Sequence, residues 1–587
     1  MKLSQITLKG FRNFKNATIN LNEKSLIIGA NDVGKTNLFH AIRLLLDRSF
    51  SDYDIEPLDS DFYAFEETND FEIFLYFDDV VEECVLSKLK EKVSDDNKLI
   101  LAYKGYRDKT TRAKTYKFFG GSNIDSLEEF QDRYYRKVLN VKYISSRRDF
   151  HNYINREKNY LFQAAKENRS GTEVEADELL YSEIEKELGD IDNKIPQLNF
   201  IASATSKINE ELLKLSLHHG KQRVVFDATT SNVESFISHV SIASKSNGQN
   251  VLIGGDGRLN QIYLALWASR NELTEENVKE VTIFCIEEPE AHLHPHQQRK
   301  LADYLNEVLK GQVLISTHSP QIASEFSPNS IIRLYNKSNM SVAASEGCSV
   351  IISNSFDHFG YRMSIIPAEA FFSDVVLLVE VASEELFYRA MAKQIGVDLD
   401  RLNISILTVE GVGFKVFIDI LNSLEIDWVL RTDCDVSKIP YKAEYRFAGV
   451  ERCVGFYKSS YELDVETEKL LKEHGQNLRG FATPNPNEEN KDACDIISGN
   501  MENYNMFLSN KDLEHDIYDA LETELKILFP NKDRQSFIAA LQKKKAVNMY
   551  NLLKKKEDLL TGLKNTDIAK PLQTCEKLAK HIQDGSH

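Results

Sequence analysis

The chain has 587 residues, of which 42% are hydrophobic and 28% are charged, and this composition excludes a disordered or fibrous protein. Its length exceeds what one hydrophobic core organises, so several domains are expected. The net charge of −18 argues against indiscriminate coating of nucleic acid, although a local basic groove remains compatible with DNA binding.

Two stretches contain enough basic residues to supply such a groove. Lys104–Lys117 holds six basic residues against one Asp, and Leu541–Lys556 contains two Lys triplets. For either stretch taken alone, a solvated surface is favoured over a binding face.

The sequence predicts a cytoplasmic protein with reduced thiols. No apolar run approaches the roughly 20 residues that span a bilayer, and the amino terminus alternates like a strand instead of forming the apolar core of a signal peptide. The seven cysteines stand singly, without a C-x-x-C pair or a His cluster at zinc spacing.

In chain order, the predicted elements form two α/β domains, the first of which is interrupted by helices. Strand-like stretches surround a helix after Gly34, and strand-like runs return at 281–286 and 313–316. A continuous apolar run at 375–379 begins a second parallel sheet, which continues with runs at 404–409 and 428–430 and ends in charged helices. The predicted parts are 1–130 and 221–365 for the first α/β domain, 131–220 for the helical insertion, and 366–587 for the second domain.

The helical insertion is predicted from apolar positions at three-to-four spacing in an otherwise polar stretch, as at Leu180, Ile184 and Leu188. Such a helix pair, with narrow apolar stripes and dense charge, often dimerises. Packing back onto its own domain is about equally compatible with the sequence.

A nucleotide-binding loop is predicted at 29–36. Its sequence, GANDVGKT, matches G-x-x-x-x-G-K-[ST] and stands directly between an apolar strand and an amphipathic helix. The glycines let backbone N–H groups surround phosphates, while Lys35 neutralises the β and γ oxygens and Thr36 ligates Mg²⁺. We therefore expect ATP with Mg²⁺ at this loop.

Two later strands deliver polar residues to the same sheet edge. The run at 281–286 ends in Glu287, which is expected to hold the water shell of Mg²⁺, and Glu288, which is expected to orient or deprotonate the attacking water. The run at 313–316 leads to His318, which is placed to sense the γ-phosphate.

Together these motifs resemble the ABC-type ATPases of the structural-maintenance, RecF and Rad50 kind. The resemblance implies that Arg12, in the opening Leu8-Lys-Gly-Phe-Arg12, approaches the nucleotide, and that the loop 254–258 caps ATP bound to the opposite subunit of a homodimer or higher homo-oligomer. This loop departs from the usual Ser-Gly-Gly-Gln form. The predicted nucleotide-binding residues are Arg12, Asn31, Gly34, Lys35, Thr36, Asn37, Gly255, Asp256, Glu287 and His318, with Glu288 as a catalytic residue.

A metal site is predicted where the strands of the second sheet end. The run at 375–379 delivers Glu380, and Glu384 follows about one helical turn later. After 428–430, Asp433 and Asp435 project to the same side of an extended segment. Converging carboxylates repel one another unless cations neutralise them, and oxygen ligands without Cys or His favour Mg²⁺ or Mn²⁺ over zinc.

An apolar strand ending in Glu, followed by a D-x-D after a further strand, resembles the Toprim fold. Behind an ABC-type ATPase, this order resembles the OLD (overcoming lysogenisation defect) family of nucleases, which includes the nuclease subunit of the Gabija anti-phage system. The resemblance implies further ligands at Asp512 and Glu514, and a lysine for the scissile phosphate at Lys545, with Lys543 as the alternative. Where this fold usually has Gly after the first Glu, the chain has Val381. The predicted metal ligands are Glu380, Glu384, Asp433, Asp435, Asp512 and Glu514, with Thr36 at the nucleotide; these six acids, Lys545 and Glu288 are the predicted catalytic residues.

The predicted function is that of an ATP-binding endonuclease that nicks or cuts double-stranded DNA by two-metal hydrolysis under nucleotide control. The resemblance implies a setting in anti-phage defence, with a UvrD-like helicase as a partner. Two other classes stay open: a DNA-clamping ATPase of the RecF/Rad50 kind with a degenerate Toprim scaffold, and a primase or ligand-binding module using the same metals. A topoisomerase would need a nucleophilic Tyr, and no Tyr lies in a recognisable motif.

Overall fold

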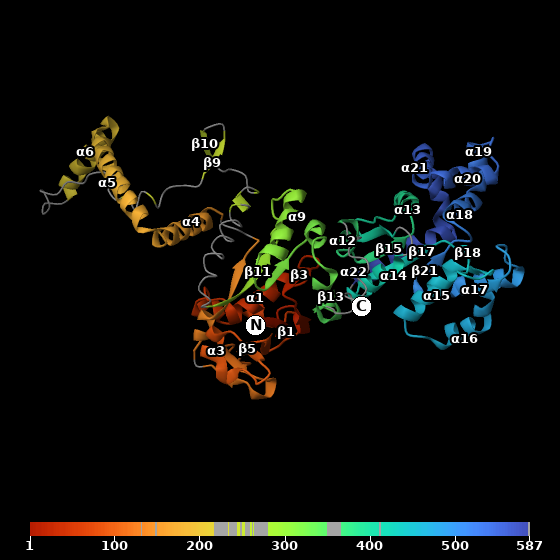
Figure 1. Cartoon of the computed structure of the whole chain (residues 1–587), viewed down its shortest axis with the longest axis horizontal. Coiled ribbons are helices and arrows are strands. Elements are labelled where there is room, and N and C mark those ends of the chain that lie inside the picture. Colours follow the sequence, from red (N-terminus) through yellow and green to blue (C-terminus); the bar gives the residue numbers. More distant parts are fainter. Residues whose placement is uncertain are drawn as a thin grey trace. The chain divides into compact units, whose positions relative to one another are not determined.

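The computed structural model describes residues 1–130, 132–146, 150–215, 280–348, 365–409 and 413–584, together with short pieces at 233, 237, 243–246, 249–252, 257, 259–260 and 262. The chain forms two compact units, and Figure 1 follows their elements in chain order. The first unit comprises 1–146, 279–290 and 295–587, and the second comprises 147–278 and 291–294.

An antiparallel sheet opens the first unit. Its strand order is β2-β1-β4-β5-β6-β7, and its strands are joined by consecutive antiparallel pairings. Apolar side chains on one face, such as Phe71 and Tyr103, are fully buried against the rest of the domain. The strands are β1 (Lys2–Phe11), β2 (Phe14–Asn20), β4 (Asp70–Asp78), β5 (Leu99–Arg107), β6 (Lys114–Gly121) and β7 (Glu128–Glu129), and the short helices nearby are α2 (Asp52–Ile55) and α3 (Glu83–Leu89).

The nucleotide-binding loop belongs to a second, largely parallel sheet of order β14-β13-β3-β12-β11-β8. The helix α1 (Lys35–Leu46) follows β3 and buries Leu38, Phe39 and Ile42 in a core that includes residues of both sheets. The strands are β3 (Lys24–Ile28), β8 (Leu139–Ile144), β11 (Val281–Glu287), β12 (Val313–Ser316), β13 (Ile331–Lys337) and β14 (Met340–Ala343), and the helices α9 (Pro295–Asp303) and α10 (Pro320–Ala323) flank β12 in the chain.

One predicted boundary differs from the structure. The sequence predicts a helical insertion from residue 131, but β8 lies beyond that point and pairs in parallel with β11. The six-residue strand is too short to show a clear alternation, and only its pairing with a distant strand defines it.

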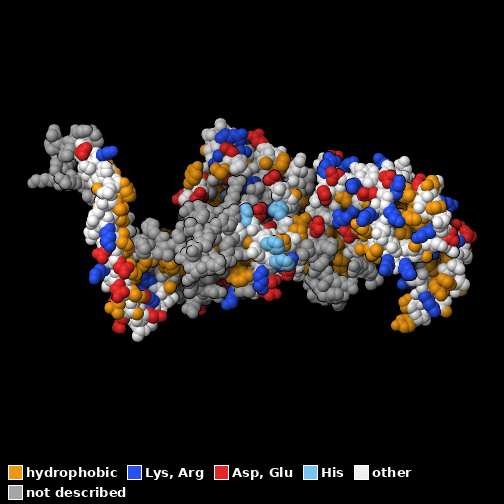
Figure 2. All heavy atoms as spheres, turned by 90° about the horizontal axis from the view of Figure 1, so that it is seen from above, with side chains coloured by type: hydrophobic (Ala, Val, Ile, Leu, Met, Phe, Trp, Pro, Cys, Tyr) orange, Lys and Arg blue, Asp and Glu red, His pale blue; other side chains and the backbone are white. Residues whose placement is uncertain are grey.

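The second unit is helical, as predicted for this region, with α4 (Phe150–Glu167), α5 (Gly171–Lys194) and α6 (Asn199–Leu215) and the strand pair β9 (Ala243–Ser246) and β10 (Gln249–Leu252). Several apolar side chains of these helices face solvent, including Leu179 at 72% and Phe200 at 71% exposure, and Figure 2 shows apolar side chains along this unit. Dimerisation through these helices stays a prediction. The predicted loop residues Gly255 and Asp256 lie outside the described residues.

A separate parallel sheet of order β16-β15-β17-β21 forms the core of the carboxyl-terminal part. All five residues of its central strand β15 are buried, which explains the uninterrupted apolar run in the sequence. The strands are β15 (Val375–Val379), β16 (Ile404–Thr408), β17 (Asp427–Thr432) and β21 (Met506–Leu508), and the preceding or connecting helices include α12 (Ile365–Ala370), α13 (Ala382–Ile395), α14 (Phe414–Ser423), α15 (Ala448–Ser460), α16 (Val465–His474) and α17 (Glu488–Met501).

A small antiparallel sheet and a group of helices complete this part. As the sequence predicts, the last residues are helical and charged, and the final helix contacts β15 and β17. The remaining elements are β18 (Val436–Lys438), β19 (Tyr445–Phe447) and β20 (Arg479–Phe481), then α18 (Leu513–Ala520), α19 (Glu522–Leu528), α20 (Arg534–Lys543), α21 (Lys545–Lys555) and α22 (Lys570–Gln583).

Two simpler expectations concern membranes and cysteines. Within the described part of the chain, no helix combines the length and the apolar character needed to cross a bilayer. All seven cysteines fall in described ranges and are free thiols, as their spacing predicts.

Candidate functional site

The nucleotide-binding loop has the backbone conformation that its glycines allow. Gly34, at the start of α1, adopts a left-handed φ of 99°. A Cβ at Gly29 would lie 2.3 Å from the backbone oxygen of Leu334 on β13, so only glycine fits between the loop and that strand. Gly34 thus allows the turn at the start of α1, and the close approach of β13 requires glycine at position 29.

Lys35 is folded back onto this loop. Its Nζ donates hydrogen bonds to the backbone oxygens of Gly29 (2.9 Å) and Ala30 (2.7 Å), and its side chain is buried. Burial lowers the pKa of Lys35, although Glu288 opposes this shift. The predicted partners Asn31 and Thr36 are exposed at the same loop. A phosphate group can replace the two carbonyl partners and stabilise the buried ammonium.

Arg12 and Asn37, predicted from separate motifs, are brought together beside the loop. Arg12 donates to Asn37 Oδ1 at 2.8 Å and to Asp61 Oδ1 at 2.8 and 2.9 Å. Asn37 in turn donates to Asn13 Oδ1 at 2.8 Å. Asp61, which is buried and holds the guanidinium, was not predicted, because its position depends on the turn before β4.

The acidic end of β11 and the end of β12 meet as predicted. His318 Nε2 lies 3.9 Å from Glu288 Oε1, and burial lowers the pKa of His318, reinforced by Lys35. Glu287 accepts a hydrogen bond of 2.7 Å from the hydroxyl of Tyr143 on β8. Sequence reasoning missed Tyr143 because it missed β8.

Glu290 is a further buried acid that was not singled out. Its Oε1 accepts hydrogen bonds from Thr317 Oγ1 at 2.7 Å and from the backbone N–H of His318 at 2.8 Å. Burial raises the pKa of Glu290. Its place two residues after Glu288 in the same acidic run was the available signal. These contacts fix the loop that carries His318.

In the carboxyl-terminal sheet, the predicted acids stand after the carboxyl ends of β15, β17 and β21. Glu380 follows β15 directly, and Glu384 lies in the first turn of α13. Glu384 Oε2 accepts the backbone N–H of Glu380 (2.6 Å) and of Val381 (3.2 Å). Val381 is extended, with φ at −138°, so the turn forms without the left-handed residue that glycine usually supplies here.

A buried arginine links the acids of three elements. Arg431 Nη1 pairs with Glu384 and, at 2.8 Å, with Asp433 Oδ1, while Nη2 lies 3.7 Å from Asp516 Oδ2. The Arg431 side chain is only 3% exposed. Arg431 stands two residues before Asp433, in the pattern R-x-D-x-D. Alternate residues of an extended segment share a face, so this pattern was the signal that could have identified Arg431.

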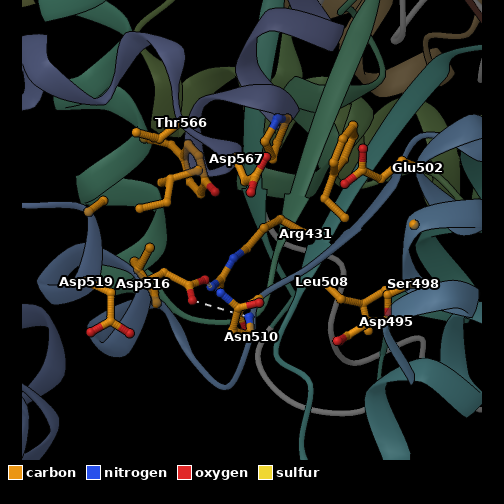
Figure 3. Close-up of a pocket in the computed structure, with 18 residues that line it drawn as sticks. Arg431, Asp495, Ser498, Glu502, Leu508, Asn510, Asp516, Asp519, Thr566 and Asp567 are labelled. Carbon is orange, nitrogen blue, oxygen red and sulfur yellow. Dashed lines mark hydrogen bonds and ion pairs between the residues drawn. The ribbon is translucent and has the colours of Figure 1, made fainter. Parts of the chain in front are cut away.

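Arg431 also lines a cavity of about 340 Å³. Figure 3 shows its guanidinium beside Asp516, next to Asn510, whose backbone N–H donates to Asp516 Oδ1 at 3.2 Å. Burial raises the pKa of Asp516 to about 6. Asp516 thus faces Arg431 at 3.7 Å without a hydrogen bond between them.

A second arginine stands between two further predicted acids, Glu380 and Asp435. Arg452, on α15, lies 3.8 Å from Glu380 Oε2 and 3.9 Å from Asp435 Oδ2. Its Nη1 donates to Thr432 Oγ1 at 3.2 Å. Burial raises the pKa of Glu380 and of Asp435, and neighbouring Asp433 raises both further. The arginine offsets part of this repulsion.

The residues implied after β21 divide between two roles. Glu514 Oε2 is buried without a hydrogen-bond partner and lies 3.8 Å from Lys545 Nζ, and burial raises the pKa of Glu514. Asp512 instead caps α18 and accepts hydrogen bonds from His515 Nδ1 (2.6 Å) and Gln542 (2.8 Å). Burial works against ionisation of Asp512, but the hydrogen bonds from His515 and Gln542 leave its pKa lowered.

This donor set suits a hard divalent cation, because it consists of carboxylate oxygens, one of which is buried and unsatisfied at Glu514. Among the residues that the structure describes, however, no three acidic, histidine or cysteine side chains already surround one point as a metal site does. The two arginines lie between the acids instead. A divalent cation bound by these acids would have to replace part of this internal pairing.

The loop with Asp433 is packed directly against the start of α15. A Cβ at Gly449 would lie 2.1 Å from the backbone oxygen of Asp433. Gly449→Ala should therefore displace this loop and destabilise the domain by roughly 1–3 kcal/mol, as overpacking does. Denaturant midpoints of the purified variant measure the loss.

Gly455→Ala in the same helix is the matched control, because a Cβ there meets nothing within 4 Å. We expect it to leave the domain as stable or to stabilise it by up to about 1 kcal/mol through helix propensity. Equal midpoints for the Gly449 and Gly455 variants would contradict the close packing of this loop.

Comparisons with known proteins agree with this two-part organisation. A family model described as "AAA ATPase domain" matches residues 1–323. A second, described as "Overcoming lysogenization defect protein-like, TOPRIM domain", matches residues 371–435, which include the ends of β15 and β17. The α/β fold class is confirmed, with an ATPase domain followed by a Toprim domain. Domains of these two kinds generally use a nucleotide and a divalent metal.

The chain is similar to curated nucleases of this organisation. It is 27% identical to "Endonuclease GajA" of Bacillus cereus (strain VD045) over 94% of this chain and 95% of that protein. It is 31% identical to "Old nuclease" of Escherichia phage P2 over 31% of this chain and 33% of that protein. Among solved structures, the SMC head domain from Thermotoga maritima aligns with 58% of this chain and 98% of its own, at 13% identity and a TM-score of 0.31.

Proposed function

Because the chain belongs to the AAA ATPase domain family and continues into an OLD-like Toprim domain, we propose that it is an ATP-binding, metal-dependent DNA endonuclease under nucleotide control. The similarity to an endonuclease extends over 94% of the chain, so both domains are included. We further propose the role in anti-phage defence and a division into an ATPase domain, a helical insertion that begins after β8, and a Toprim domain from residue 366.

The observation that carries the proposal is the gathering of acids after adjacent parallel strands. Glu380, Asp433 and Asp435 follow β15 and β17, which are hydrogen-bonded neighbours. Burial and mutual repulsion raise the pKa of Glu380 and of Asp435, so the ionised carboxylates destabilise the folded protein where they are held together. Such an arrangement is typical of a functional site and not of a solvated surface.

The proposed reaction is hydrolysis of a DNA phosphodiester. A pair of divalent cations supplies an activated water and neutralises charge on the phosphate and the leaving oxygen. The chain's own contribution is to hold these ions and to position Lys545, whose ammonium stands 3.8 Å from Glu514 and is expected to contact the scissile phosphate. Oxygen ligands favour Mg²⁺ or Mn²⁺. The proposed ligands are Glu380, Glu384, Asp433, Asp435, Asp512 and Glu514.

At the other domain, we expect Lys35 and Thr36 to bind ATP with Mg²⁺, Glu287 and Glu288 to position water, and His318 to contact the γ-phosphate. The contact of His318 with Glu288 and the hydrogen bonds of its loop to Glu290 support this role. A homodimer or higher homo-oligomer, with a UvrD-like helicase as partner, is the assembly that the resemblance implies.

One observation favours a second candidate, a DNA-clamping ATPase with a degenerate Toprim scaffold. In the described residues the acids are paired with Arg431 and Arg452 and do not form a ready metal cluster. A scaffold stabilised by internal ion pairs would have the same arrangement.

Supercoiled plasmid separates the two candidates. The protein is incubated with plasmid and Mg²⁺ or Mn²⁺, with and without ATP, and the products are resolved on a gel. Metal-dependent nicked or linear DNA supports the endonuclease, and a shift in mobility without broken strands supports the clamp. A primase would instead join added nucleoside triphosphates into a primer on a single-stranded template.

A further inference from the structure

Arg452 lies among the proposed metal ligands because the start of α15, which follows the strands β18 and β19, packs against the loop that carries Asp433 and Asp435. The backbone N–H of Ala448 donates to the backbone oxygen of Asp435 at 2.7 Å, and Gly449 allows Asp433 to approach the helix. Arg452 stands four residues after Ala448, on the same face of the helix. Its side chain therefore extends toward the acids.

The contacts of this guanidinium are loose. Its distances of 3.8 Å to Glu380 and 3.9 Å to Asp435 are too long for hydrogen bonds, whereas Nη1 donates a hydrogen bond to Thr432 Oγ1 at 3.2 Å. Phe414 offers a ring face 5.8 Å from the guanidinium carbon. With 22% of its side chain exposed, Arg452 retains access to solvent.

Arg431 shows what a fixed arginine looks like in the same centre. It is 3% exposed and hydrogen-bonds Asp433 at 2.8 Å. Arg431 is thus fixed among the acids by burial and by short contacts, whereas Arg452 is half-buried and holds its two acids at longer distances. A guanidinium has five N–H donors in a planar fork that fits two phosphate oxygens.

We propose that Arg452 is an exchangeable resident cation of the nuclease centre: it holds Glu380 and Asp435 together before metal binds, and it binds a DNA phosphate once divalent cations have taken its place between them. This inference rests on the proposed function. Two carboxylates about 4 Å from one guanidinium are only partly neutralised, so a doubly charged ion competes well for them. The displaced guanidinium then matches the geometry and charge of a phosphate.

Exchange has two opposite consequences for a variant without the positive charge. Arg452→Gln removes the cation that competes with the metal, so Mn²⁺ should bind about tenfold more tightly in the absence of DNA. The same variant loses a phosphate contact, so the KM for DNA should rise about tenfold or more. If Arg452 were purely structural, its replacement would weaken metal binding instead, because the acids could then move apart.

The experiment measures Mn²⁺ binding and plasmid cutting on the full-length protein. Free Mn²⁺ is quantified by electron paramagnetic resonance during titration without DNA, and initial cutting rates give kcat and KM. Arg446→Gln is the matched control, because Arg446 pairs with Glu451 at 2.8 Å, outside the proposed ligands. We expect this control to leave both quantities at the parental level.

Arg452→Lys keeps the charge but not the planar fork, so it should restore the parental Mn²⁺ affinity while the KM stays raised several-fold. This variant also carries the test if Arg452→Gln does not fold. Unchanged or weaker Mn²⁺ binding in Arg452→Gln, or a parental KM in Arg452→Lys, would overturn the exchange. A parental protein that neither binds Mn²⁺ nor cuts DNA would instead overturn the proposed function.

Discussion

Replacement of Glu380 by alanine is expected to lower metal-dependent plasmid cutting by on the order of 10³-fold or more, while ATP binding stays at the parental level. Glu380 follows the central strand β15, and its pKa is raised by burial and by Asp433 and Asp435. It thus stands where carboxylates from two strands are forced together. Cutting rates with Mg²⁺ and with Mn²⁺, measured beside nucleotide binding, test the expectation.

Glu385→Ala is the matched control for this variant. Glu385 also lies in α13, but its carboxylate is bound to Arg389 at 2.9 Å and to Thr408 Oγ1 at 2.9 Å. Its loss should leave the cutting rate within a few-fold of the parental protein. Equal cutting by the Glu380 and Glu385 variants would show that the acids do not form the nuclease centre.

Stability gives a second readout for the Glu380 position. Because the pKa of Glu380 is raised in the folded protein, its ionisation above the usual Glu range opposes folding. Glu380→Gln should therefore leave the metal-free protein as stable at pH 8 as the parent, or more stable, and this difference should vanish at low pH, where the carboxyl is protonated in both states. Denaturant midpoints at the two pH values measure it.

Replacement of Lys35 by alanine is expected to weaken ATP binding by about 100-fold and to make cutting insensitive to ATP. The ammonium is buried beside Glu288, and its two hydrogen bonds go to carbonyl oxygens of the loop that phosphate is expected to occupy. Charge-assisted hydrogen bonds are worth roughly 1.5–3 kcal/mol, which corresponds to the expected loss. Calorimetric titration with ATP measures the affinity.

Lys24→Ala is the matched control, since Lys24 lies at the other end of the same strand β3 and its Nζ donates to the backbone oxygens of Leu309 and Gly311. We expect parental ATP affinity in this variant. If Lys35→Ala bound ATP as tightly as the parent, the prediction that this loop binds the ATP phosphates would be wrong. The parental protein in the same plasmid assay reports whether ATP stimulates or restrains cutting.

Much of the fold could be predicted because it is encoded locally. The strands β12 and β15 have the predicted bounds, since each is a short, fully buried apolar run bounded by polar residues. The loop before α1 was predicted from its glycines and Lys35. By contrast, β8 was missed and the first sheet was not foreseen as antiparallel, because both depend on pairings between distant segments.

For the nuclease centre, the amino-acid sequence by itself determined which acids stand at strand ends, because parallel strands bring their carboxyl ends to one edge whatever their order. Only the tertiary structure decided how those acids are paired. Arg452 reaches Glu380 through the packing of α15 on the Asp433 loop, and Asp512 caps α18 and accepts a hydrogen bond from Gln542. Long side chains and helix ends take their partners from neighbours in space, and spacing along the chain does not specify these neighbours.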